Sequence, residues 1–234
     1  MAVKSSSPST NWFLHFRSRT KLGKNDLLLV MPNKGRLYEP TLKTLSRAEI
    51  EVRHAERKYL CETSLPELKI LLARAADIPT YVYHGAADLG ITGLDMVYES
   101  QAELYELLDL KYVPCRLVLA VPTSSEIKAV EDIKKGFRLA TEYPNLTRGF
   151  FEQKGIQVDI ITIHGAAEIT PALGLADGIT DLVATGSTLK ANELREVATI
   201  LESTTRLFSN KIAFRTKNNL IQRFVDRLKR GQRQ

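Results

Sequence analysis

From Asp26 onward, short apolar runs alternate with segments in which apolar residues recur at helical spacing. This alternation is typical of α/β proteins, in which crossover helices join the strands of a parallel sheet. The pattern predicts strands over Leu27–Met31, Leu89–Thr92, Arg116–Val121, Phe137–Thr141, Val158–Ile163 and Asp181–Thr185. It predicts helices over Leu37–Ser46, Leu65–Ala73, Ile78–His84, Thr147–Lys154, Ala167–Leu175 and Ile221–Arg230.

A short pattern, D-L-x-x-T-G, occurs twice, at Asp88–Gly93 and at Asp181–Gly186. Each copy is typical of a strand that ends in a Gly-containing turn and opens a helix, which presents backbone N–H groups to an anion. One copy in each half predicts two similar lobes, each offering a loop to a shared cleft. An isolated copy would carry little weight, because the pattern also arises by chance in α/β proteins.

The net charge of +6 is divided unevenly along the chain. Residues 1–25 carry +5 and residues 211–234 carry +7, which leaves −6 for residues 26–210. The body is therefore mildly acidic, and the basic ends do not indicate nucleic-acid binding, since a nucleic-acid reader usually carries its basic patch on the fold. No apolar run is long enough for a transmembrane helix. The two cysteines lack the spacing of a disulfide framework or a zinc site, which favours reduced thiols in a cytoplasmic protein.

The segment Gly174–Leu189 contains the residues best suited to binding a phosphate. After an apolar strand, Ala184–Thr188 supplies consecutive backbone donors, three hydroxyl groups and one glycine that permits close approach. These residues suit a phosphomonoester, although a helix start capped by serine or threonine would look the same. Asp177 and Asp181 lie near the start of this strand and could hold ribose hydroxyls or Mg²⁺, or Asp177 could simply be solvated.

A second candidate is the loop Met31–Leu37, in which Lys34 and Arg36 flank Gly35 between an apolar strand and a helix. Two cations on a glycine turn suit a polyphosphate, because arginine can grip two oxygens at once. Arg57 and Arg74 lie beside apolar or small residues, where arginines are more often ordinary surface residues. None of the four histidines has the spacing of a metal ligand or an evident serine or cysteine partner, so a hydrolytic triad finds no support.

Five segments resemble the ATP phosphoribosyltransferase family, which opens histidine biosynthesis: Met31–Leu37, Asp77–Val82, Gly85–Gly93, Ala140–Thr147 and Gly174–Leu189. The resemblance runs in order from about Leu27 to Asn210. It implies an α/β, two-lobed periplasmic-binding-protein-like (type II) fold with the active site in the interlobe cleft. It also implies transfer of a 5-phosphoribosyl group from phosphoribosyl pyrophosphate to N1 of ATP, with release of pyrophosphate and with Mg²⁺ as cofactor.

The resemblance further implies roles for individual residues. Those expected to bind phosphoribosyl pyrophosphate are Asp177, Asp181, Ala184, Thr185, Gly186, Ser187 and Thr188. Those expected to bind ATP are Lys34, Gly35, Arg36, Arg57, Arg74, Gly93, Glu142 and Tyr143, of which Arg57, Arg36 and Arg74 are the expected catalytic residues. The family often has glutamate where this chain has Ala184, so any contact from that carboxylate is absent. The Mg²⁺ ligands stay unassigned.

The expected organisation is a flexible basic extension over residues 1–25, lobe I over 26–115 and 196–215, lobe II over 116–195, and a basic C-terminal helix or tail over 216–234. The extension also has the composition of an organellar transit peptide. The chain resembles the short form of the family, which implies a homodimer of catalytic subunits joined to a histidyl-tRNA-synthetase-like regulatory subunit. The alternative is a non-catalytic two-lobed solute- or effector-binding protein, for which we would expect a signal peptide or a helix-turn-helix.

Overall fold

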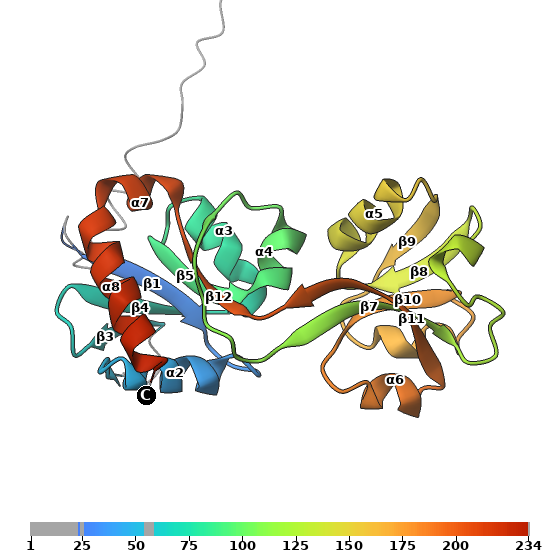
Figure 1. The fold of residues 1–234 in the computed structure, drawn as a ribbon, viewed down its shortest axis with the longest axis horizontal. Coiled ribbons are helices and arrows are strands. Elements are labelled where there is room, and N and C mark those ends of the chain that lie inside the picture. The colour runs from blue at the N-terminus through green and yellow to red at the C-terminus, as the bar shows by residue number, and fades with distance from the viewer. Residues whose placement is uncertain (1–22, 24–25, 54–58, 234) are drawn as a thin grey trace, which may run out of the picture. The chain divides into compact units, whose positions relative to one another are not determined.

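The computed structural model describes residues 23, 26–53 and 59–233 of the chain. It divides into two compact units (Figure 1). Unit 1 comprises Met1–Thr92, Glu103–Leu110 and Arg206–Gln234, and unit 2 comprises Gly93–Ala102 and Lys111–Thr205. Within the described residues, no helix is long and apolar enough to cross a membrane.

Unit 1 is built on a seven-stranded sheet with the order β2-β3-β4-β1-β5-β12-β6. The strands are β1 (Leu27–Pro32), β2 (Val52–Arg53), β3 (Leu60–Thr63), β4 (Leu68–Ala73), β5 (Leu89–Gly93), β6 (Tyr105–Asp109) and β12 (Thr205–Ser209). The helices are α2 (Tyr38–Arg47), α3 (Ile78–Tyr83), α7 (Lys211–Thr216) and α8 (Asn218–Gly231). β1 is parallel to β4 and β5, whereas β3 is antiparallel to β2 and β4, and β12 to β6. The sheet is therefore mixed rather than purely parallel.

Unit 2 is built on a five-stranded sheet with the order β11-β7-β10-β8-β9. Its strands are β7 (Cys115–Pro122), β8 (Phe137–Thr141), β9 (Val158–Thr162), β10 (Gly178–Val183) and β11 (Leu194–Ser203), and its helices are α4 (Leu94–Ser100), α5 (Pro144–Gln153) and α6 (Ser187–Ala191). β8 is parallel to β9 and β10, while β7 is antiparallel to β10 and β11. This sheet is also mixed.

Unit 2 is larger than the lobe II that we expected over residues 116–195. β11 pairs with β7 from Leu194 to Ser203, so this part of the chain stays with unit 2. Helix α4, at Leu94–Ser100, also packs against α5 and β11. Long-range pairing of this kind leaves no local mark in the sequence, which is why the expected boundaries differ from the observed ones.

Two expected helices are wrong. Leu65–Ala73 contains strand β4, which pairs in parallel with β1. A short apolar run that is buried on both faces has no period that would distinguish a strand from a helix. Ala167–Leu175 forms only a 3-10 turn over Ala167–Ile169 (η3), because Pro171 lacks the N–H group that a longer helix would need.

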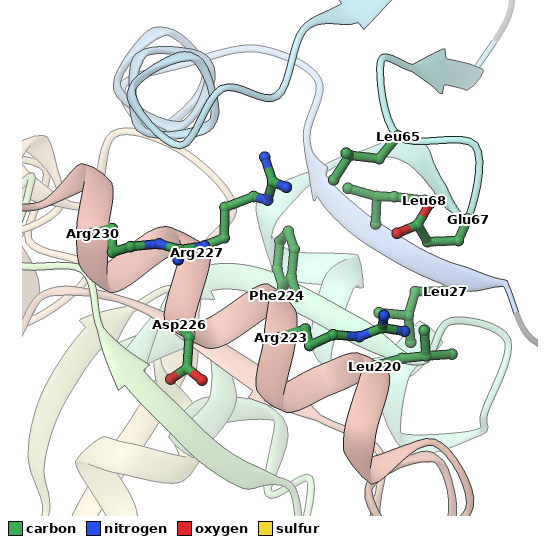
Figure 2. A pocket seen from close by; sticks show the side chains of 10 residues that line it. All are labelled: Leu27, Leu65, Glu67, Leu68, Leu220, Arg223, Phe224, Asp226, Arg227 and Arg230. Atoms are coloured by element: carbon green, nitrogen blue, oxygen red, sulfur yellow. The ribbon is translucent and has the colours of Figure 1, made fainter.

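The amphipathic helix α8 covers the sheet of unit 1 with Ile221, Phe224, Val225 and Leu228, all buried. Its arginines Arg223, Arg227 and Arg230 line a pocket of about 270 Å³, together with Leu27, Leu65, Glu67, Leu68, Leu220, Phe224 and Asp226 (Figure 2). The expected C-terminal helix is therefore an integral layer of unit 1.

A buried ion pair fixes the start of α8. Lys217 Nζ lies 2.6 Å from Asp88 Oδ2, and the two side chains are 8% and 9% exposed. The same carboxylate oxygen accepts the Leu28 N–H at 2.9 Å, and Lys217 also donates to the Asp26 carbonyl at 2.6 Å. The pair thus joins helix α8 to strand β1.

Candidate functional site

The chain turns sharply between β10 and α6, where four consecutive residues, Thr185–Thr188, lie at the surface. Gly186 has φ +79°, a left-handed conformation that costs a residue with a side chain about 1–2 kcal/mol. The hydroxyls of Thr185 and Ser187 lie 3.1 Å apart. Because the first N–H groups of a helix have no acceptor within the helix, this turn presents amides and hydroxyls together. The geometry suits a bound phosphate.

Buried residues hold both ends of this turn in place. Val183, the last residue of β10, and Leu189, in α6, belong to the same core cluster as Val118 and Ile179. The exposed polar turn is therefore anchored by apolar packing on both sides. Such anchoring lets a ligand meet amides whose positions are already set.

An ion pair beside the turn was missed from the sequence. Arg116, the β7 residue that pairs with Val183, donates to both carboxylate oxygens of Glu196 at 2.9 and 3.1 Å. A Cβ atom on Gly186 would lie 3.7 Å from Glu196 Oε1. The carboxylate beside the turn therefore comes from β11 rather than from position 184. The one signal in the sequence that could have indicated this ion pair is that Arg116 begins a predicted strand.

Asp181, Glu142 and Tyr143 form a second part of the site in unit 2. Asp181 is half-buried on β10, and the Tyr143 ring is 5% exposed. Burial raises the pKa of Tyr143 well above its usual range, and the nearby carboxylates of Asp95, Glu142 and Asp181 raise it further. Tyr143 therefore stays protonated, with its phenol among acidic side chains.

Three threonines position Tyr143 at the start of α5. The Thr141 hydroxyl accepts the Tyr143 N–H at 2.9 Å and donates to the Thr180 carbonyl at 2.8 Å. The Thr147 and Thr180 hydroxyls lie 2.5 Å apart. The end of β8 and the start of α5 are thus tied to β10, the strand that leads to the phosphate-suited turn.

Asp177 lies apart from these residues. It precedes β10, whereas Thr185 follows it, and a strand of six residues spans about 20 Å. One pentose phosphate cannot reach both. The Asp177 carboxylate is bound instead by Arg138, with Nη2 2.6 Å from Oδ1, and this hydrogen bond lowers the pKa of Asp177. The expected ribose contact from Asp177 is therefore not supported by its place in the fold.

In unit 1 the structure brings Lys34, Gly35, Arg36 and Arg74 to one edge of the sheet. Pro32 at the end of β1 pairs with Ala73 at the end of β4, and Asn33 N–H donates to the Ala73 carbonyl at 2.7 Å. The loop after β1 therefore lies beside Arg74. The three cations are exposed, and none forms an ion pair with another described residue.

The same loop contains a buried acceptor that the sequence did not indicate. The side-chain oxygen of Asn33 is buried and has no hydrogen-bond partner among the described residues. Buried polar atoms are nearly always paired, so an unpaired one within a cationic loop fits a site that a ligand completes.

Two further expected site residues need separate mention. Arg57 lies outside the described residues. Gly93 ends β5 in an extended conformation, and a Cβ atom there would lie 2.2 Å from Asp95 Oδ1. A side chain at Gly93 would therefore displace the Asp95 carboxylate from its place at the start of α4.

Among the described residues, no group of three or more histidine, cysteine, aspartate or glutamate side chains could hold a metal ion. Mg²⁺ in phosphoryl and pyrophosphoryl sites is usually bound by one or two carboxylates together with substrate phosphates. The donors near Tyr143 fit that arrangement better than a metal site made by protein groups alone.

Comparisons with known proteins show which family the chain resembles. The HisG: ATP phosphoribosyltransferase family model matches residues 74–230. An ATP phosphoribosyltransferase from Methanopyrus kandleri is 47% identical over 204 residues, covering 87% of this chain and 71% of that protein. In two other relatives of the same name the shared part is 65% of the length. These relatives are thus longer than the region they share with this chain.

Solved structures give the same result. The ATP phosphoribosyl transferase (HisG:HisZ) complex from Thermotoga maritima matches with a TM-score of 0.79 and 32% identity, covering 88% of this chain and 98% of that one. The periplasmic aliphatic sulphonate binding protein SsuA from Escherichia coli is 16% identical, with a TM-score of 0.54, and covers 90% of this chain and 73% of that one. The latter likeness shows the fold alone and confirms the expected periplasmic-binding-protein-like architecture.

Proposed function

Because the chain belongs to the ATP phosphoribosyltransferase family, we propose that it transfers a 5-phosphoribosyl group from phosphoribosyl pyrophosphate to N1 of ATP. Pyrophosphate is the second product, and the reaction is the first step of histidine biosynthesis. The observation that carries the proposal is the anchored, exposed turn Thr185–Thr188, whose amides and hydroxyls suit a sugar phosphate.

In this proposal the turn holds the 5-phosphate, and Asp181, two residues before the end of β10, meets the ribose hydroxyls. Lys34, Arg36 and Arg74 bind the polyphosphate groups, and Arg57 is assigned with them on the family resemblance. Gly93, Glu142 and Tyr143 contribute to the ATP site. We leave Asp177 out because Arg138 already binds its carboxylate.

The reaction needs stabilisation of developing charge rather than a strong base. Adenine N1 attacks the anomeric carbon with its own lone pair. The bond from that carbon to the pyrophosphate oxygen breaks, and its electron pair leaves with pyrophosphate. Negative charge therefore gathers on the leaving group, where preorganised cations lower the barrier. The exposed guanidinium groups of Arg36 and Arg74 are suited to this task.

We propose that Mg²⁺ would be held by the pyrophosphate group together with one or two carboxylates, and would supply further positive charge at the leaving group. Asp181 and Glu142 are our candidates for these carboxylates, because both lie close enough to Tyr143 to raise the pKa of its phenol. The prediction that the active site lies in the cleft between the lobes stays a prediction.

We further propose a homodimer of catalytic subunits that joins a histidyl-tRNA-synthetase-like regulatory subunit in the cytoplasm. The support is that the Thermotoga maritima relative was solved as a HisG:HisZ complex. Native co-purification followed by mass determination would test the assembly.

Pyrophosphate release tests the reaction itself. The wild-type chain with ATP, phosphoribosyl pyrophosphate and Mg²⁺ should release pyrophosphate only when both substrates are present. A solute- or effector-binding protein would bind without release, and that result would reject the proposal. Arg57→Ala should lower turnover about 10²-fold, whereas the exposed Arg53 of β2 provides the matched Arg53→Ala control.

A further inference from the structure

Helix α5 begins without a capping side chain of its own. Tyr143 holds the N-cap position but makes no capping hydrogen bond, and Pro144 follows it. The first N–H groups of a helix need outside acceptors, which a serine, threonine, aspartate or asparagine at the N-cap usually provides. In this chain, Glu99 of α4 provides these acceptors. Its Oε1 accepts the Asn145 N–H and its Oε2 accepts the Leu146 N–H, both at 3.0 Å.

A return contact strengthens this link. Asn145 Nδ2 donates to the Glu99 carbonyl at 2.8 Å, and Arg148 donates to Asn145 Oδ1 at 3.2 Å, which orients the amide. Three hydrogen bonds therefore join the end of α4 to the first turn of α5, and all of these residues belong to unit 2.

The start of α4 is also fixed. Asp95 N–H donates to Ser203 Oγ at 3.1 Å, and the Ser203 hydroxyl donates back to the Asp95 carboxylate. Leu94 N–H donates to the Thr204 carbonyl at 3.1 Å. Held at both ends, α4 sets the distance between Asp95 and the residues that precede α5.

The energetics of Glu99 argue against a role in stability alone. Burial raises the pKa of Glu99 despite its two amide hydrogen bonds and the nearby Arg148. A raised carboxyl pKa means that the ionised form is disfavoured in the folded chain, so the charge costs stability at pH values above that pKa. A neutral side chain of the same size removes this cost, which offsets the loss of one amide hydrogen bond.

We propose that Glu99 is a positioning residue that fixes Glu142 and Tyr143 against Asp95 and Asp181 in the ATP-binding part of the site. The inference rests on the proposed function, which places Glu142 and Tyr143 at the nucleotide. Glu99 does not itself contact substrate. It acts by setting where α5 begins.

Glu99→Gln tests this role. Glutamine keeps the size and one acceptor oxygen, but it turns an NH₂ group toward the second N–H. The expected result is a KM for ATP raised about tenfold, the effect of one hydrogen bond to a charged acceptor. The KM for phosphoribosyl pyrophosphate and the midpoint of thermal unfolding should stay at wild-type values. Glu131→Gln makes the same charge change at an exposed position and is the matched control.

Asn145→Ala is a second variant, which keeps both carboxylate–amide bonds and removes the return bond together with the Arg148 contact to Asn145 Oδ1. It should raise the KM for ATP less than Glu99→Gln does. A wild-type KM for ATP in Glu99→Gln overturns the inference. An equal loss of every kinetic parameter together with a lower unfolding midpoint also overturns it, since the role would then be structural.

A wild-type chain that releases no pyrophosphate would reject the proposed function instead. Calorimetric titration of wild-type and Glu99→Gln protein with ATP then decides the positioning role by itself. Weaker ATP binding in the variant supports the role, and equal binding or no binding by either protein overturns it.

Discussion

Replacing Gly186 with alanine tests whether the turn after β10 binds the sugar phosphate. An added Cβ atom would meet Glu196 Oε1 at 3.7 Å and Val183 Cγ1 at 3.9 Å, which are ordinary contact distances. Steric overlap therefore contributes little. The cost comes from the backbone, because φ is +79° and alanine pays about 1–2 kcal/mol in the left-handed region.

This backbone strain should weaken the binding of a phosphate to the turn. Val183 and Leu189 anchor the ends of the turn, but Thr185, Ser187 and Thr188 are exposed. In the free variant, the backbone between the anchors can therefore relax toward negative φ. Binding a phosphate would then have to restore the strained form at a cost of about 1–2 kcal/mol, which corresponds to roughly 5- to 30-fold weaker affinity. We expect Gly186→Ala to raise the KM for phosphoribosyl pyrophosphate by this factor, and to leave the KM for ATP near the wild-type value.

Gly136 provides the matched control. Its φ is +85°, nothing lies within 4 Å of an added Cβ, and it precedes β8 at the edge of the sheet opposite the turn. Gly136→Ala should lower the free energy of unfolding by about 1–2 kcal/mol without changing either KM. Steady-state pyrophosphate release and urea unfolding measure the two effects. If Gly186→Ala keeps the wild-type KM for phosphoribosyl pyrophosphate, the turn does not hold the phosphate.

The other predictions concern charged residues. Arg36→Ala and Arg74→Ala should each lower kcat about 10²-fold in the pyrophosphate assay, because each removes a preorganised cation from the leaving group; unchanged rates would remove them from the site. Asp181→Asn should raise the KM for phosphoribosyl pyrophosphate about tenfold or more, whereas Asp177→Asn should leave it unchanged, and the reverse outcome would restore Asp177 to the site. Because Arg138 lowers the pKa of Asp177, the pair stabilises the fold above the ordinary carboxyl pKa and loses that contribution as the pH falls; acid unfolding should show a small effect that Asp177→Asn abolishes. Lys217→Met should lower the free energy of unfolding by about 3–5 kcal/mol, since it leaves the Asp88 carboxylate buried without its cation; a loss below about 1 kcal/mol in urea unfolding would contradict that account.

Elements marked by strong local signals were predicted well from the sequence. The strand predicted over Leu27–Met31 is observed at Leu27–Pro32, and the strand predicted over Phe137–Thr141 is observed with the same bounds. Helix α8 has a clear apolar face and was also expected. β4 was mistaken for a helix because burial on both faces removes the alternation that identifies a strand.

The candidate site was likewise predicted only where local features of the sequence mark it. The turn Thr185–Thr188 was identified because glycine, hydroxyls and a preceding apolar strand are all local features. The sequence placed Asp177 and Asp181 on either side of a strand start, as observed, but it could not show that Arg138 binds the Asp177 carboxylate. Glu99 and Asn145 lie 46 positions apart, so only the folded chain shows that one caps the helix of the other.

The ion pair between Lys217 and Asp88 bears on the order in which the chain can fold during synthesis. β1 leaves the ribosome early, yet the lysine that neutralises its buried neighbour, and the helix that covers its sheet, are made only after all of unit 2. β12, which lies between β5 and β6, also comes late. Unit 2 has all of its strands once Ser203 has emerged. Unit 1 therefore begins before unit 2 but is completed after it. Nascent chains stalled before Lys217 should contain a complete unit 2 and an incomplete unit 1.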